Sequence, residues 1–143
     1  EKVPVCIHRA PLSTHERFLS FLLEYYGGAF PTWCAPLQVM VIPVRDDHHE
    51  YANELIDLMR SKKIRAELDG SDHSFNKKIR NNAVSKTPIL LIIGGDEVEN
   101  KTVTIRRYGI KEQQTMPAEE FMSLLNQEIL ERKMMREPMG ALL

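Results

Sequence analysis

The run Pro88-Ile89-Leu90-Leu91-Ile92-Ile93, followed by Gly94-Gly95, constrains the fold of this chain more than any other feature. Consecutive large apolar side chains leave no polar face to turn toward water, so the run predicts a strand buried on both sides. Such a strand is typical of a parallel sheet with helices on both faces. The glycine pair predicts a tight turn at the end of the strand.

Strand and helix patterns alternate on both sides of this run. Apolar residues predict further strands at 38–44, 64–68 and 101–107. Helical spacing of apolar residues predicts helices at 50–62, at 74–85 and from Pro117 onward. The sequence therefore predicts an α/β fold with a mostly parallel, mixed five-stranded sheet flanked by three helices.

The first 36 residues have a different pattern. Residues 3–7 are β-rich and predict a strand, but a strand needs neighbours, so we expect the chain to begin within a larger domain. A helix is predicted from Ser13 or Thr14 to the stop at Gly27-Gly28. Prolines and bulky aromatics in 29–36 predict a stiff linker. We therefore divide the chain into a strand-helix remnant of one domain (1–28), the linker, a second domain (37–135) and a mobile tail (136–143).

Composition places this chain among ordinary soluble proteins, with 43% apolar and 27% charged residues. A net charge of -1 gives no overall attraction to polyanions, so a nucleic-acid site would have to be local. Residues 73–88 contain Lys77, Lys78, Arg80 and Lys86 and no acidic residue. Such a run fits either a nucleic-acid surface or a solvated helix face.

Cys6 and Cys34 form neither a CxxC motif nor a disulfide framework, which fits a reducing compartment. No apolar run approaches the ~20 residues that span a bilayer. We therefore expect a cytoplasmic protein that does not interact with membranes.

Candidate binding residues gather where predicted strands end. In parallel sheets ligands bind beyond the carboxyl ends of the strands, which here carry Asp46-Asp47, Asp69-Gly70 and residues 94–97. A carboxylate such as Glu97 can accept from the adjacent N–H donors of an unpaired guanine, and Arg80 or Arg106 can donate to a base edge. No catalytic triad or GxxxxGK loop is present, which favours a binding module, with a generic charged surface as the alternative.

Two residues near the start could take part in other sites. Arg17 follows Glu16 at a predicted helix start and could hold a phosphate, or could be a surface arginine behind a capping glutamate. His8 shares a strand face with Cys6, but zinc needs three or four ligands, which favours a hydrogen-bonded histidine.

Several motifs together resemble a known family. Residues 7–18 (Ile-His-Arg-Ala-Pro to Glu-Arg-Phe) resemble motif 3 of class II aminoacyl-tRNA synthetases. Phe30-Pro31-Thr32-Trp33 resembles the junction that follows it in threonyl-tRNA synthetases, and residues 76–81 with 92–94 resemble their C-terminal anticodon-binding domain. The likeness covers about residues 3–133. Ser13 stands where this motif usually has glycine, the residue that takes positive φ at least cost.

The resemblance implies a role for each candidate residue. Arg17 would contact ATP, and His8 would be one of three ligands of a zinc ion whose other ligands lie outside this chain. Anticodon bases would be contacted by Arg80, Glu97 and Arg106, with further basic positions at Lys86, Lys77 and Lys78.

For the complete enzyme, the resemblance implies activation of threonine with ATP and its transfer to threonine tRNA. Residues 1–28 would be the end of the catalytic domain with motif 3, and the fragment alone would be inactive, without bound ATP or zinc. Its partners would be the anticodon loop and the rest of the synthetase, which would form a homodimer, whereas the fragment would be a monomer. A non-enzymatic RNA-binding regulator and a small-ligand α/β module are the alternative functions.

Overall fold

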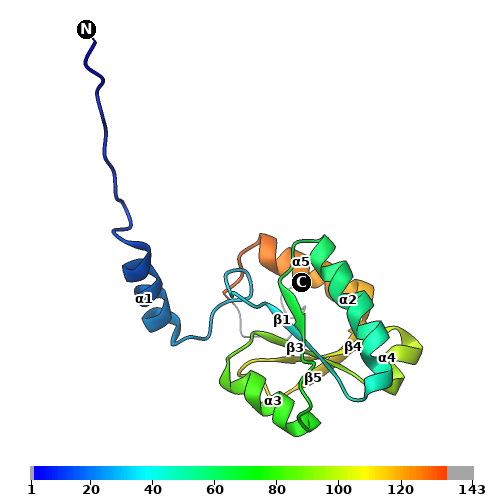
Figure 1. The fold of residues 1–143 in the computed structure, drawn as a ribbon. Coiled ribbons are helices and arrows are strands. Elements are labelled where there is room, and N and C mark those ends of the chain that lie inside the picture. Colours follow the sequence, from blue (N-terminus) through cyan, green and yellow to red (C-terminus); the bar gives the residue numbers. More distant parts are fainter. Residues whose placement is uncertain (1, 135–143) are drawn as a thin grey trace.

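The computed structural model describes residues 2–134, which contain a five-stranded sheet in the order β2-β1-β3-β4-β5 (Figure 1). The strands are β1 (Val39–Pro43), β2 (Ala66–Leu68), β3 (Ile89–Ile93), β4 (Thr102–Arg107) and β5 (Gln113–Pro117). β1 pairs in parallel with β2 and β3, whereas β4 is antiparallel to β3 and β5. The predicted mixed sheet of five strands is confirmed.

Helices lie on both faces of this sheet. They are α2 (His49–Ser61), α3 (Phe75–Val84), α4 (Gly95–Asn100) and α5 (Ala118–Leu130), with α1 (His15–Tyr26) preceding the sheet and a short 3-10 turn, η1 (Asp46–His48), before α2. The boundaries of β1, α2, α3, β3 and β4 differ from the predicted ones by only a residue or two.

The core explains why β3 is apolar throughout. Ile89, Leu91 and Ile93 point to one face and pack in a large cluster with α2 and α5, including the fully buried Met59 and Phe121. The alternate residues of the strand point to the opposite face, where a smaller cluster forms beneath α3. Both sides of β3 are therefore covered by helices.

A buried ion pair joins β4 to α5. The guanidinium of Arg107 donates to the carboxylate of Glu128, and their side chains are only 6% and 8% exposed. Such a pair is costly to break by removing one member, because the remaining charge stays away from water.

The helix α1 stands apart from the sheet, at the far end of residues 27–38 (Figure 1). Thr14 caps its start by accepting from the Arg17 amide at 3.4 Å, and Gly27 ends it in the left-handed region with φ of 57°. None of its residues is buried, and Phe21 and Tyr25 are 60% and 67% exposed. Tyr26 packs against Phe30 after the helix, but most of the apolar side chains of α1 face solvent in the described part of the chain.

The sequence prediction was wrong in three places. Residues 3–7 form no strand, because no neighbouring strand in the described residues pairs with them. Gly94-Gly95 does not form only a tight turn, because Gly94 is the N-cap of α4. With this additional helix, four helices rather than the predicted three accompany the described sheet. The fifth strand, β5, was not located because its sequence, Gln-Gln-Thr-Met-Pro, has little apolar signal.

The predicted linker, 29–36, packs against the sheet domain: Gln38 donates to the Thr32 carbonyl at 2.8 Å and Arg65 to the Ala35 carbonyl at 2.8 Å. The predicted mobile tail, 136–143, lies outside the described residues. Among the helices that the structure describes, none has the length and apolar character needed to cross a bilayer.

Candidate nucleic-acid interface

The sheet face that carries α3 is only partly covered by that helix. α3 packs over β1, with Ile79 in contact with the cluster that contains Ile42 and Leu90. β4 and β5 extend this face beyond α3, on the side away from β2. We call the part of the face formed by β4 and β5 the open sheet face.

Polar side chains occupy the open sheet face. Thr104 pairs with Ile92 and Arg106 with Leu90, so both side chains point to the α3 side. Across β4, Thr115 is the partner of Thr104, and Gln113 is the partner of Arg106. Arg106 is half-buried, whereas Gln113 and Thr115 are exposed, so this surface is accessible to solvent.

Arg80 lies on the flank of α3 that borders the open sheet face. Lys78 and Asn82 lie on the other flank, where both contact Asp69 after β2. At 3.6 residues per turn, Arg80 is about 200° around the helix from each of them. Ala83, one turn after Arg80, lines a cavity of about 290 Å³ together with Arg106. Of the two predicted arginines, Arg106 therefore lines this cavity, and Arg80 lies one helical turn before its α3 wall.

The two neighbouring lysines of α3 have different environments. Lys77 is exposed, whereas Lys78 is 8% exposed and its ammonium donates to the Asp69 carbonyl at 3.0 Å. Lys78 therefore holds α3 against the end of β2, and its charge is not presented on the helix surface.

Asp69 completes this attachment with its carboxylate, which accepts from Asn82 Nδ2 at 2.9 Å and from the Ser71 hydroxyl at 2.6 Å. Burial alone would raise the pKa of Asp69, but hydrogen bonds from Ser71 and Asn82 and the Lys78 charge outweigh it and hold the pKa below its usual value. The carboxylate is thus kept ionised while it anchors α3.

Glu97 uses both carboxylate oxygens within the protein. Its Oε2 accepts from the Gly94 amide at 2.9 Å, which stabilises the start of α4, and its Oε1 accepts from the Thr104 hydroxyl at 2.6 Å. The half-buried carboxylate is thereby fixed at the border of the open sheet face. Half-buried Thr104 and exposed Thr115 extend the hydrogen bonds of Glu97 to the surface of the open sheet face.

Lys86 contacts the N-terminal part of the chain. It has φ of 56°, and its ammonium donates to the Gly27 carbonyl at the end of α1. A positive charge at a helix carboxyl terminus is favourable because the last carbonyls carry partial negative charge. In this conformation Lys86 connects the end of α3 to α1.

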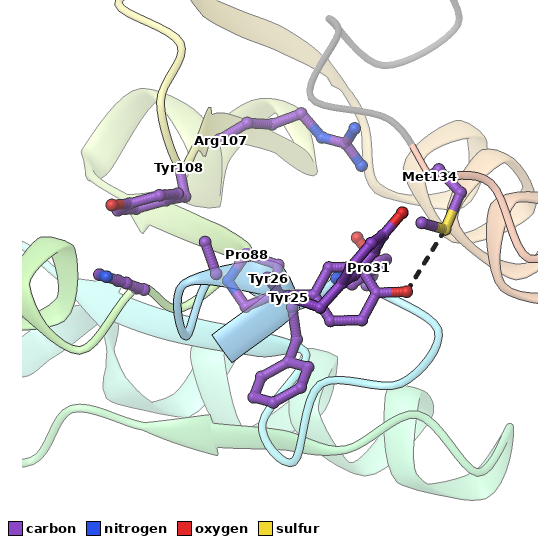
Figure 2. Close-up of a pocket in the computed structure, with 11 residues that line it drawn as sticks. Tyr25, Tyr26, Pro31, Pro88, Arg107, Tyr108 and Met134 are labelled. Carbon is purple, nitrogen blue, oxygen red and sulfur yellow. Dashed lines mark hydrogen bonds between the residues drawn. The ribbon is translucent and has the colours of Figure 1, made fainter. Parts of the chain in front are cut away.

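A cavity of about 310 Å³ lies between this junction and the sheet domain (Figure 2). Figure 2 shows Tyr25 and Tyr26 across the cavity from Arg107 and Tyr108. The Tyr26 hydroxyl points to the Met134 sulfur at 3.8 Å.

The predicted residues of the first segment are exposed. His8 and Arg17 are both open to solvent, and among residues 2–134 no three His, Cys, Asp or Glu side chains gather in a way that could hold a metal ion. Ser13 has φ of 59°, the conformation that glycine at this position adopts at least cost. The turn before α1 therefore keeps a backbone shape that serine takes only with strain.

The acidic strand ends were only partly informative. Asp69 serves α3, and Asp46 and Asp47 lie in η1. Buried His48, whose Nδ1 lies 3.2 Å from the Ile93 carbonyl, packs at the same edge. The two threonines of the open sheet face were missed: alternation in residues 101–107 signalled an outward-facing Thr104, but no pattern marked Thr115.

Comparisons with known proteins give a consistent result. Residues 38–128 match the family described as anticodon binding domain. The chain is 45% identical over 131 residues to the threonine–tRNA ligase of Geobacillus kaustophilus, and 46% identical over 130 residues to that of Ligilactobacillus salivarius. These matches cover 91% and 90% of the chain but 20% of each relative, so the chain spans about a fifth of their length.

Solved structures show the same fold. The RNA binding domain of threonyl-tRNA synthetase from Cryptosporidium parvum is 26% identical with a TM-score of 0.74, covering 78% of this chain and 28% of that chain. A prolyl-tRNA synthetase of the same organism, solved with halofuginone and AMPPNP, is 16% identical with a TM-score of 0.59, covering 71% of this chain and 24% of its own. The second likeness concerns the fold alone.

Proposed function

This chain belongs to the anticodon binding domain family, and we propose that it reads the anticodon of a threonine tRNA as part of a threonine–tRNA ligase. The choice of tRNA is supported by the 45% identity to a threonine–tRNA ligase. The observation that carries the proposal is the open sheet face, bordered by Arg106 on β4 and by the flank of α3 that bears Arg80.

The chemistry of this surface suits unpaired RNA bases. A guanidinium offers several N–H donors in one plane and can hydrogen-bond a base edge or stack on its face. Double-stranded RNA hides its base edges in a deep, narrow groove, whereas a loop presents them. Lys77 adds attraction for the RNA backbone, and Glu97 adds a fixed acceptor. Lys78 and Lys86 support the surface through their contacts within the protein.

Residues 1–28 are proposed to be the end of the catalytic domain. α1 leaves its apolar side chains exposed, which supports packing against a domain that lies outside this chain. In that complete enzyme, threonine would be activated with ATP and transferred to its tRNA, with Arg17 as an ATP contact. The fragment alone would carry out neither step.

Zinc binding by this chain alone does not fit the described residues. His8 is exposed, and zinc needs three or four ligands, which do not gather among residues 2–134. His8 can therefore serve as a ligand only if the remaining ligands come from outside the chain.

The setting of the protein is also part of the proposal. We place it in the cytoplasm, which is supported by the free cysteines Cys6 and Cys34. The complete enzyme would be a homodimer through its catalytic domain, and the isolated chain a monomer.

The test is titration of the 143-residue chain with an anticodon stem-loop of threonine tRNA, beside a loop of scrambled sequence. For ~3 phosphate contacts, the logarithm of affinity should fall with the logarithm of salt concentration at a slope near -2. Arg80→Ala and Arg106→Ala should each cost about 1–3 kcal/mol for the correct loop. Arg60→Ala, an exposed arginine of α2 on the opposite face, is the matched control. Equal losses on both loops would refute base reading.

A further inference from the structure

A chain of hydrogen bonds runs from Glu97 to the surface of the open sheet face. Thr104 Oγ1 lies 2.6 Å from Glu97 Oε1, and Thr115 Oγ1 lies 2.7 Å from Thr104 Oγ1. Glu97 is fixed at the inner end because its other oxygen accepts from the Gly94 amide. Thr115 is at the outer end, on the exposed strand β5.

The inner end sets the direction of every hydrogen bond in the chain. An ionised carboxylate can only accept, so Thr104 must donate its single hydroxyl proton to Glu97. The Thr104 oxygen then accepts, which makes Thr115 the donor between the two hydroxyls. Because the only proton of Thr115 is used in this way, its oxygen offers only lone pairs to the solvent.

The geometry of the sheet keeps this arrangement in place. Thr104 and Thr115 are register partners on β4 and β5, and Arg106 and Gln113 form the pair next to them on the same face. β-branched side chains have restricted χ1 angles in strands, so the hydroxyls stay in hydrogen-bonding range. The open sheet face thus presents an acceptor beside the donors of Arg106.

We propose that Thr115 Oγ1 is a specificity contact that accepts a hydrogen bond from an N–H group of an unpaired anticodon base, with Thr104 and Glu97 as positioning residues. The inference rests on the proposed function. Phosphate oxygens are excluded as partners, because they too can only accept. Threonine codons begin with A and C, so the anticodon carries uracil and guanine opposite them. The available donors are therefore the imino and amino groups of guanine and the imino group of uracil.

The experiment removes one N–H donor at a time from the anticodon stem-loop. Inosine lacks the amino group of guanosine, while 1-methylguanosine and 3-methyluridine lack the imino protons. Affinities of the full chain for each loop are measured by fluorescence anisotropy. One donor-deleted loop should bind the unchanged protein roughly 5–30-fold more weakly, the range expected for a hydrogen bond of about 1–2 kcal/mol.

Variants of Thr115 show whether that loss belongs to its hydroxyl. In Thr115→Val, which keeps the shape and removes the hydroxyl, the same donor deletion should change affinity less than twofold. Thr115→Ser keeps the hydroxyl and should respond like the unchanged protein. Circular dichroism verifies that both variants are folded.

Glu97→Gln tests the direction of the hydrogen bonds. The Gly94 amide should hold the side-chain oxygen, which turns the NH2 group toward Thr104 and makes Thr104 an acceptor from it. Thr104 then donates to Thr115, and the Thr115 proton points outward. Preference for the donor-bearing base should be lost, although the size and fold of the protein are unchanged.

The outcomes separate two failures. If the unchanged chain binds the threonine and scrambled loops equally, the proposed function is wrong. If it binds the threonine loop selectively but each donor deletion costs the same factor in Thr115→Val as in the unchanged chain, the Thr115 inference is overturned while the proposed function stands. Retained base preference in Glu97→Gln would overturn the assigned direction.

Discussion

Replacing Asp69 with alanine tests how strongly α3 is held at the end of β2. The carboxylate accepts three hydrogen bonds, from Asn82 Nδ2 at 2.9 Å and from the Ser71 amide and hydroxyl at 3.2 and 2.6 Å. Ser71 is exposed, so water replaces the carboxylate there at little cost. Asn82 is only 6% exposed, and after the substitution it keeps just the Lys78 carbonyl, at 2.9 Å.

The cost is therefore concentrated in one buried hydrogen bond to a charged group, with a contribution of about 1.5–3 kcal/mol. Because Asp69 is partly exposed, we expect the free energy of unfolding to fall by about 2 kcal/mol, and Tm by roughly 6–10 °C. Urea unfolding followed by circular dichroism at pH 7 measures the change. Asp72→Ala, in the same exposed loop, should stay within about 0.5 kcal/mol.

The pH dependence gives a second test. The pKa of Asp69 is lowered in the folded state by its hydrogen bonds, against the effect of burial. Its contribution is therefore complete above the unfolded pKa of about 3.9 and is lost as the pH falls through the lower folded pKa. The difference between the unchanged protein and Asp69→Ala should shrink in acid. A difference below about 0.5 kcal/mol at pH 7, or one that grows in acid, would refute the reasoning.

Three further changes have defined outcomes. Glu128→Leu should lower the free energy of unfolding, measured in urea, by about 3–5 kcal/mol, because the buried Arg107 loses its carboxylate partner. A combined Arg107→Met and Glu128→Leu variant should regain most of this loss. A double variant as unstable as the single one would contradict the reasoning. Lys86→Met should speed proteolytic cleavage near Gly27, because the Lys86 ammonium holds the end of α1. It should change the free energy of unfolding of the sheet domain by less than about 0.5 kcal/mol. An unchanged cleavage rate would show that the ammonium does not hold α1. Removing residues 1–28 should reduce both the binding of a hydrophobic dye and self-association measured by light scattering, because it removes the exposed apolar side chains of α1. Unchanged values would show that these side chains do not mediate either interaction.

Much of the fold could be predicted because local pattern and tertiary environment agree. Ile89–Ile93 is apolar at each position, and in the structure each side of that strand meets a helix-covered core. The helix of residues 50–62 was equally legible, since Tyr51, Leu55 and Met59 mark one buried face. These elements bury apolar residues at the spacing of their own secondary structure.

The remaining elements depend on partners that local sequence does not reveal. β5 is a strand because its backbone pairs with β4, although its own residues are mostly polar. Residues 3–7 have the composition of a strand but no pairing partner in the described chain. Tertiary pairing decided both cases against local propensity.

The binding surface was predictable in part for the same reason. Strand periodicity places Arg106 on the α3 side of the sheet, and helix periodicity places Arg80 on the flank of α3 away from Lys78 and Asn82. Lys77 and Lys78 look alike in the sequence, and only the Asp69 carbonyl makes one of them structural. Thr115 could not be found because its role depends on a hydroxyl partner on another strand.

The sheet order has a consequence for the kinetics of folding. Thr104 and Thr115 are separated by 11 residues and meet across neighbouring antiparallel strands, a type of contact that closes within about 1–10 μs. The place of α3 depends instead on the parallel pairing of Val39 with Ile89, which are far apart in the chain. Such non-local pairing is slow to form. We therefore expect the part of the surface that carries Thr104 and Thr115 to form first, and the part that carries Arg80 to form later. Bound RNA would then slow unfolding, because it would hold the late-formed part in place.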